Sequence, residues 1–243
     1  IANDAFEAKQ ELVHFDNIDH IVFAGMGGSG AVGDIIASIL SKSDIHVSLI
    51  KGYLLPKTVN KNTLVVVTSV SGNTIESLTV LNSARKMDCK LIAFSSGGIL
   101  EKMCNDNHIF FRKIPFFHSP RTSLVNFIYS ILNILNSIFP IEKKEINDSL
   151  KQLKNIKNQI DSNNLTSSNP AINLADWIKG IPIIYYPHGL QSVATRFKSA
   201  LQENAKTHAI IEDVIETCHN GIVSWEKPSI DQPILIRGED EDR

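Results

Sequence analysis

Cysteine is scarce in this 243-residue sequence, and its scarcity excludes two classes of protein. The three cysteines, Cys89, Cys104 and Cys218, are far apart and match neither a zinc-ligand spacing nor a disulfide framework. We therefore expect reduced thiols with a packing role, which are typical of a cytoplasmic protein.

The sequence also lacks an excess of charge and any long apolar run. Its net charge is -2, with both signs mixed along the chain. The sequence therefore lacks the excess of positive charge that binds nucleic acid or an anionic membrane. No tract approaches the length of a membrane span. The chain begins at Ile1 rather than Met and shows no signal peptide, so we expect the natural N-terminus to lie upstream. With 43% hydrophobic residues, the chain can form one large or two small globular domains.

Apolar strand patterns alternate with helical patterns through the first half of the chain. The strand patterns are rich in Val, Ile and Leu without polar alternation, which is typical of a parallel sheet covered by helices on both faces. The expected strands are 18–24, 46–50, 63–68, 90–94 and 108–111, and the expected helices are 29–40, 73–87, 98–105 and 122–139.

The character of the sequence then changes before a second α/β pattern begins. Residues 142–160 have Ile and Leu at helical spacing among Lys, Glu and Asn, and a polar stretch follows at 161–170. Further on, we expect helices at 171–179 and 190–205 and strands at 181–186, 208–211 and 232–236. The sequence thus predicts an α/β domain at 1–140, a helical linker at 141–170 and a second α/β domain at 171–243.

Two short loops of small residues each follow a predicted strand and precede a predicted helix. Residues 25–30 read Gly-Met-Gly-Gly-Ser-Gly, and residues 69–74 read Ser-Val-Ser-Gly-Asn-Thr. Backbone N–H groups at the starts of the following helices point toward an anion, and the helix dipoles favour negative charge there. Neither loop contains Lys or Arg, so the pattern predicts a phosphate pocket built from amides and hydroxyls.

A dinucleotide site is an alternative for the first of these loops. Gly25, Gly27 and Gly30 have the G-x-G-x-x-G spacing between a strand and a helix. The second predicted strand ends without the acidic residue that would bind a ribose, although Lys51 could accept a 2′-phosphate there. A tight turn without any ligand is a further alternative. The second loop favours a single phosphate bound from two sides.

Five motifs in this order carry a resemblance to a known family: the loops 25–30 and 69–74, Pro120-Arg121, the Glu-Asn-Ala-Lys run at 203–206, and His219-Asn220. The chain resembles the bifunctional phosphoglucose/phosphomannose isomerases. The resemblance implies two tandem sugar isomerase (SIS) domains. It also implies interconversion of fructose 6-phosphate with glucose 6-phosphate and mannose 6-phosphate, without a metal or other cofactor. The family's enzymes are homodimers whose active sites contain residues from both subunits.

The same resemblance assigns roles to individual residues. Moving a carbonyl between C1 and C2 needs a base that transfers a proton through an enediol, and Glu203 matches the family's base. Opening the sugar ring needs a side chain that can gain and lose a proton near neutral pH. The resemblance assigns this role to His219, which would act in the active site of the partner subunit. Arg121 would stabilise the enediolate oxygen. The implied phosphate ligands are Gly27, Gly28, Ser29, Ser69, Ser71 and Thr74.

Three departures from the family pattern affect this transfer of roles. Val70 replaces an aromatic residue, and Gly221 follows His219-Asn220 where the family commonly has Glu. The chain also stops well short of the family's length, so we expect the second domain to be truncated at its C-terminus and to lack a catalytic Lys.

A non-catalytic SIS sugar-phosphate sensor and a nicotinamide-dependent enzyme are the alternative functions. A sensor would keep both loops and dispense with Glu203 and His219, so the presence of these two residues favours an enzyme. Regulators of this kind usually carry a helix-turn-helix region, and the sequence shows none.

Overall fold

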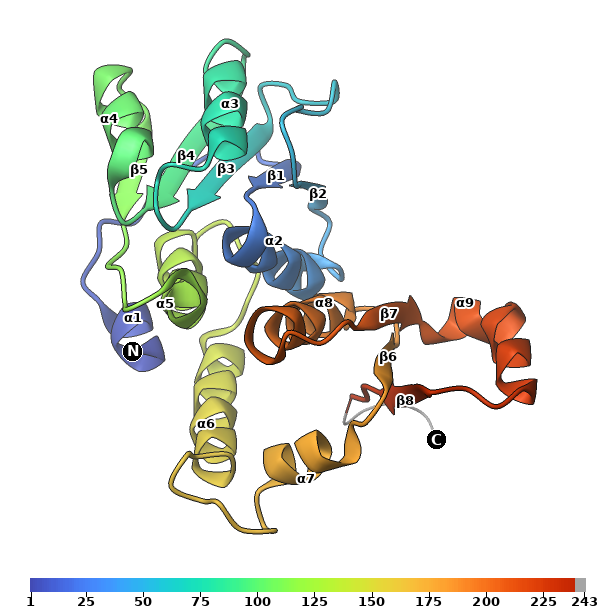
Figure 1. Ribbon diagram of the computed structural model, residues 1–243. Helices are drawn as coiled ribbons and strands as arrows, with labels where there is room; N and C mark the ends of the chain where they lie inside the picture. Colours follow the sequence, from blue (N-terminus) through green and yellow to red (C-terminus); the bar gives the residue numbers. More distant parts are fainter. Residues whose placement is uncertain (239–243) are drawn as a thin grey trace. The chain divides into compact units, whose positions relative to one another are not determined.

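A computed structural model describes residues 1–238 of the chain. The chain divides into two compact units, Ile1–Ile141 and Glu142–Arg243. Each unit has its own parallel sheet, and the two are described separately below (Figure 1).

The first unit contains a five-stranded sheet in the order β2-β1-β3-β4-β5, with every strand pair parallel. The strands are β1 (His20–Ala24), β2 (His46–Ile50), β3 (Thr63–Ser69), β4 (Lys90–Ser95) and β5 (Phe110–Lys113). The helices are α1 (Ala2–Glu7), α2 (Gly27–Leu40), α3 (Ile75–Ala84), α4 (Gly98–Asp106) and α5 (Pro120–Ile134). The predicted alternation of strands and helices is confirmed in this unit.

Helices cover both faces of this sheet, which explains the absence of polar alternation in β1 and β3 (Figure 1). On one face, Val22 belongs to a buried cluster with Val80 of α3 and Leu100 of α4. On the other face, α2 approaches so closely that a Cβ added to Gly33 would lie 2.8 Å from the Cβ of Phe23. The carboxyl ends of the central strands are therefore held between two packed layers.

Some element boundaries differ from the sequence-based expectation for physical reasons. Helix α5 begins at Pro120 because the Ser119 hydroxyl accepts a hydrogen bond from Thr122 N in a capping box, and it ends at Ile134, before the expected Phe139. Strand β5 starts later than expected because His108, at φ +54°, still belongs to the preceding turn.

The second unit contains a three-stranded parallel sheet in the order β7-β6-β8. Its strands are β6 (Ile181–Tyr186), β7 (Ile210–Asp213) and β8 (Asp231–Leu235). Its α-helices are α6 (Lys143–Gln159), α7 (Pro170–Trp177), α8 (Gln191–Ala200) and α9 (Val214–His219). It also has a five-residue π-helix η1 (Leu201–Ala205), called the π-turn below, and a 3-10 helix η2 (Gly221–Glu226). The expected helix 190–205 is thus an α-helix that ends in a π-turn.

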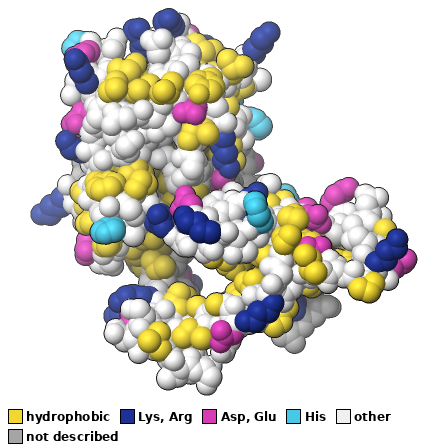
Figure 2. Space-filling view, viewed as in Figure 1, with side chains coloured by type: hydrophobic (Ala, Val, Ile, Leu, Met, Phe, Trp, Pro, Cys, Tyr) yellow, Lys and Arg dark blue, Asp and Glu magenta, His cyan; other side chains and the backbone are white. Residues whose placement is uncertain are grey.

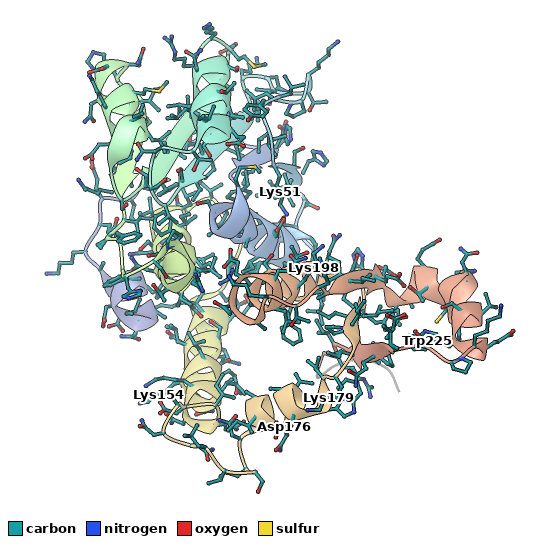
Figure 3. The ribbon with its side chains drawn as sticks, viewed as in Figure 1. Lys51, Lys154, Asp176, Lys179, Lys198 and Trp225 are labelled. Atoms are coloured by element: carbon teal, nitrogen blue, oxygen red, sulfur yellow. The ribbon has the colours of Figure 1, made fainter. Side chains whose placement is uncertain are left out.

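The buried core of the second unit is small. Ile184 of β6, Ala194 of α8 and Ala209 form its centre. At the edge of this core the Trp225 indole donates a hydrogen bond to the Tyr185 hydroxyl at 3.1 Å, and Figure 3 shows Trp225 on the chain that precedes β8. Many large apolar side chains stay exposed, and Figure 2 shows hydrophobic surface over this unit.

A histidine pair lies at the amino ends of β1 and β2, at the opposite end of the strands from the two glycine- and serine-rich loops. His20 is buried and is the register partner of His46, with the ring centroids 4.9 Å apart. Its Nε2 lies 2.9 Å from the Ser48 hydroxyl. Burial and the neighbouring His46 lower the pKa of His20, against a smaller opposite effect of Asp19.

This lowered pKa predicts a loss of stability in mild acid. The unfolded chain takes up a proton at the ordinary histidine pKa of about 6.5, before folded His20 does, so stability is full above that pH and falls below it. We expect the free energy of unfolding, measured by urea denaturation, to fall less between pH 7.5 and pH 5.5 in His20→Gln than in the unmodified protein. The matched variant at the exposed His14, His14→Gln, should keep the original pH dependence. An unchanged pH dependence in His20→Gln would contradict the assignment.

Candidate functional site

Three neighbouring strands of the first unit end at one edge of the sheet, and each runs into a helix. Strands β1 and β3 pair in parallel up to Ala24 and Val67, and β3 and β4 pair up to Ser69 and Ser95. The segments that follow are the first loop (residues 25–30), the second loop (residues 69–74) and a third loop (residues 95–98). Because parallel strands end on the same side, these loops lie together at the starts of α2, α3 and α4 (Figure 1).

The first loop needs glycine at several positions because the backbone is crowded or left-handed there. A Cβ on Gly25 would lie 2.9 Å from the carbonyl carbon of Ser29, and one on Gly30 would lie 2.8 Å from the Gly25 oxygen. Gly27, the first residue of α2, has φ +55°. The amides of Gly27 and Gly28 have no acceptor within the helix, so they are available as donors for the predicted anion.

The second loop is ordered by its own hydroxyl groups. The buried Ser69 hydroxyl accepts a hydrogen bond from Gly72 N at 3.1 Å and lies 2.9 Å from the Thr74 hydroxyl. The Ser71 hydroxyl accepts a hydrogen bond from Asn73 N at 3.2 Å. A hydroxyl that accepts a bond keeps its proton for donation, so the loop can offer O–H donors to an anion.

One hydrogen bond joins the first and second loops. The Ser29 hydroxyl, buried at the start of α2, accepts a hydrogen bond from Val70 N at 3.0 Å. The predicted ligands Ser29, Ser69, Ser71 and Thr74 are therefore brought to one edge of the sheet. Because the donor is the backbone N–H of Val70, this bond does not depend on the side chain at position 70.

The third loop is a part of the site that sequence reasoning missed. A Cβ added to Gly72 would lie 1.7 Å from the Gly97 oxygen, so the second and third loops are in direct backbone contact. The Asn73 side chain accepts a hydrogen bond from Ile99 N at 3.0 Å, in the first turn of α4. The signal was present in the sequence as Ser95-Ser96-Gly97-Gly98, which has the same small residues after a strand as the other two loops.

Arg121 lies beside the first loop, on the exposed first turn of α5. A Cβ on Gly28 would lie 3.8 Å from the Pro120 oxygen, which brings the start of α5 next to the glycine run. The predicted cation is thus near the predicted phosphate ligands within the same unit.

Glu203 and His219 belong to the second unit. Glu203 is exposed in the π-turn η1, a feature that often marks functional positions in helices. The Lys206 ammonium donates a hydrogen bond to the backbone oxygen of Glu203 at 2.8 Å. His219 is exposed at the end of α9, a short helix that the sequence did not predict and that begins where Asp213 accepts hydrogen bonds from the first-turn amides. Their catalytic roles remain predictions.

The dinucleotide alternative rested on the glycine spacing of the first loop, with Lys51 as the residue that could accept a 2′-phosphate. The Lys51 ammonium instead lies 2.6 Å from an Asp34 carboxylate oxygen on α2. This ion pair favours the single-phosphate interpretation of the first loop.

Within residues 1–238, no group of three or more His, Cys, Asp or Glu side chains is placed to hold a metal ion. None of the helices described there is long and apolar enough to cross a membrane.

Comparison with known families agrees with this architecture. The SIS domain model matches residues 14–135, and the model of the bacterial phospho-glucose isomerase C-terminal SIS domain matches residues 167–243. A solved structure, the C-terminal domain of glucosamine-fructose-6-phosphate aminotransferase from Francisella tularensis, has the same fold, with a TM-score of 0.67 and 17% identity over 99% of this chain and 73% of that one. The chain is thus an SIS-domain protein.

Its closer relatives define the family within this class. The chain is 32% identical to a bifunctional phosphoglucose/phosphomannose isomerase of Caldicellulosiruptor bescii, over 89% of this chain and 65% of that protein. It is 31% identical to the protein of the same description from Thermoplasma acidophilum, over 90% of this chain and 68% of that protein. The chain belongs to the bifunctional phosphoglucose/phosphomannose isomerase family and spans about two thirds of the length of these relatives.

Proposed function

We propose that the protein catalyses metal-independent aldose–ketose isomerisation of sugar 6-phosphates. The substrates are fructose 6-phosphate with glucose 6-phosphate, and also mannose 6-phosphate. The observation that supports this proposal best is the joining of two hydroxyl-lined loops, through Ser29 and Val70, in a member of this family. Such a site can hold one phosphate group and leave the reacting end of the sugar exposed to catalytic groups.

In the proposed reaction, Glu203 removes a proton from C1 of the open-chain ketose and returns it to C2 through an enediol. Arg121 stabilises the oxygen that becomes negative in the enediolate. His219 moves a proton between the ring oxygen and the anomeric hydroxyl when the ring opens. The phosphate stays bound to Ser29, Ser71 and the neighbouring hydroxyl and amide donors throughout.

We further propose a cytoplasmic homodimer in which His219 serves the site of the partner subunit. The cysteines support the compartment, because all three are free thiols. Burial raises the pKa of the Cys104 thiol to about 11, so this thiol is protonated and has the packing role expected for it. Sedimentation at several concentrations measures the assembly state, and a monomer at micromolar concentration would contradict the dimer.

The activity is tested by adding fructose 6-phosphate and following glucose 6-phosphate in a coupled assay, with and without a chelator. We expect product at the same rate in both, because the proposed proton transfers use only side chains. The same assay on mannose 6-phosphate tests the second substrate. Binding of sugar phosphate without turnover would favour the sensor, and turnover abolished by the chelator would contradict the metal-independent mechanism.

A further inference from the structure

A partly buried ion pair lies directly behind the first loop, with the Asp34 side chain buried and the Lys51 side chain 44% exposed. The Asp34 side chain, two turns into α2, is 10% exposed, and its carboxylate lies 2.6 Å from the ammonium of Lys51, which follows β2. The Lys51 side chain passes against the loop, because a Cβ added to Gly30 would lie 3.5 Å from its Cε. Figure 3 shows Lys51 beside α2.

This pair is close enough to influence an anion at the start of α2. Asp34 is six positions after Gly28, and a helix rises about 1.5 Å per residue, so its Cα lies about 9 Å along the axis from Gly28, with the side chain directed back toward the start of the helix. That distance is near the Debye length of about 8 Å at physiological salt, and a largely buried charge is screened less than an exposed one. An unpaired Asp34 carboxylate would therefore oppose the binding of a phosphate dianion.

The first and second loops provide no charge to offset such repulsion. Residues 25–30 and 69–74 contain neither Lys nor Arg, and their donors are neutral amides and hydroxyls. Arg121 lies beside the first loop on α5, but the Lys51 ammonium is the charge in direct contact with the Asp34 carboxylate, at 2.6 Å. Its contact with Gly30 places this charge at the same end of α2 as the proposed anion.

We propose that Lys51 determines the affinity of this site for phosphate dianions by neutralising Asp34, without being a phosphate ligand. The proposal rests on the phosphate pocket of the proposed function. It assigns the pair an electrostatic role toward the ligand in addition to its packing between β2 and α2. The residues involved are not members of either loop.

An electrostatic role and a purely structural role predict different changes in phosphate affinity for the two single substitutions. Asp34→Asn removes the negative charge and leaves the Lys51 ammonium to attract the anion, so phosphate binding becomes tighter. Lys51→Met leaves the carboxylate uncompensated, so binding becomes weaker. If the pair only held β2 against α2, the loss of either partner would loosen the loop and weaken binding in both variants.

The test is calorimetric titration of the full chain with inorganic phosphate and with fructose 6-phosphate at low and high salt. From Coulomb's law with an effective dielectric constant near that of a protein surface, we expect about fivefold weaker binding in Lys51→Met and about fivefold tighter binding in Asp34→Asn. Lys51→Arg and the double variant Asp34→Asn/Lys51→Met are the matched controls and should stay within about twofold of the unmodified protein. Both single-variant effects should shrink at high salt.

The outcomes separate this proposal from the proposed function. Single variants that shift affinity in the same direction, or that leave it unchanged, overturn the electrostatic role of Lys51. If Lys51→Met fails to fold, Asp34→Asn and the double variant still decide: both lack the carboxylate, and only Asp34→Asn keeps the Lys51 charge, so tighter binding in Asp34→Asn alone supports the proposal and equal binding in the two overturns it. Opposite shifts without any isomerase activity would support Lys51 and contradict only the enzymatic proposal. Absence of phosphate binding in the unmodified protein would overturn the pocket and this proposal together.

Discussion

The variant Glu203→Gln is expected to lose nearly all isomerase activity while it keeps its affinity for sugar phosphate. A side chain that acts as general base typically contributes about 10²- to 10⁴-fold in rate, and glutamine cannot accept the proton. The proposed phosphate donors lie in the first unit, whereas Glu203 is in the π-turn of the second, so the substitution does not alter the proposed binding groups. The measurement is kcat in the coupled assay together with the calorimetric Kd for fructose 6-phosphate.

Glu226→Gln is the matched control for this variant. Glu226 is also an exposed carboxylate of the second unit, at the end of the 3-10 helix η2, and has no role in the proposed mechanism. We expect its kcat to stay within about twofold, because surface substitutions away from special features have small effects. A Glu203→Gln enzyme that keeps more than a tenth of the original kcat would show that the base is another residue.

The second large effect is expected for Gly72→Ala in the second loop. Gly72 has φ +70°, and an added Cβ would lie 1.7 Å from the oxygen and 2.7 Å from the carbonyl carbon of Gly97. The left-handed conformation alone costs about 1–2 kcal/mol for a residue with a side chain, and the backbone overlap adds to this cost. We expect a loss of at least about 2 kcal/mol in the free energy of unfolding, with phosphate binding weakened in the fraction that folds.

Gly52→Ala separates this effect from the general cost of replacing a glycine. A Cβ at Gly52 would meet no atom within 4 Å, and we expect a change within about 0.5 kcal/mol. Chemical denaturation of both variants, followed by phosphate titration under native conditions, makes the comparison. Equal stability of the two variants would mean that the second and third loops can separate at little cost.

The fold was predictable because its strands are long apolar runs between turn-forming residues. Strands β2 and β6 lie at the residues expected from the sequence, and the other strands differ by at most two residues at either end. Helix α9 was missed because it has only six residues, too few to show a helical repeat of apolar residues. It depends on the side-chain cap of Asp213, which is also the last residue of the preceding strand. The π-turn at Glu203 was missed because it arises from a change in backbone hydrogen bonding inside one continuous helical pattern.

The candidate site was predictable only where single segments carry it. The glycines and hydroxyls of the first two loops follow from their place between strand and helix. The bond from Val70 N to Ser29 does not, because it depends on which strands become neighbours in the sheet. The ion pair of Lys51 with Asp34 was missed for the same reason, since it joins a strand end to the second turn of a helix. The roles of Glu203, His219 and Arg121 stay predictions.

The bond between Ser29 and Val70 has a consequence for how this protein tolerates sequence change. It connects positions 41 residues apart, so an alteration in one loop displaces the donors of the other. A substitution that removes the Ser29 hydroxyl should then displace the second loop as well as the first, whereas a side-chain change at Val70 keeps the bond, because the donor there is the backbone N–H. Selection that acts on the second loop would accordingly extend to position 29 of the first loop.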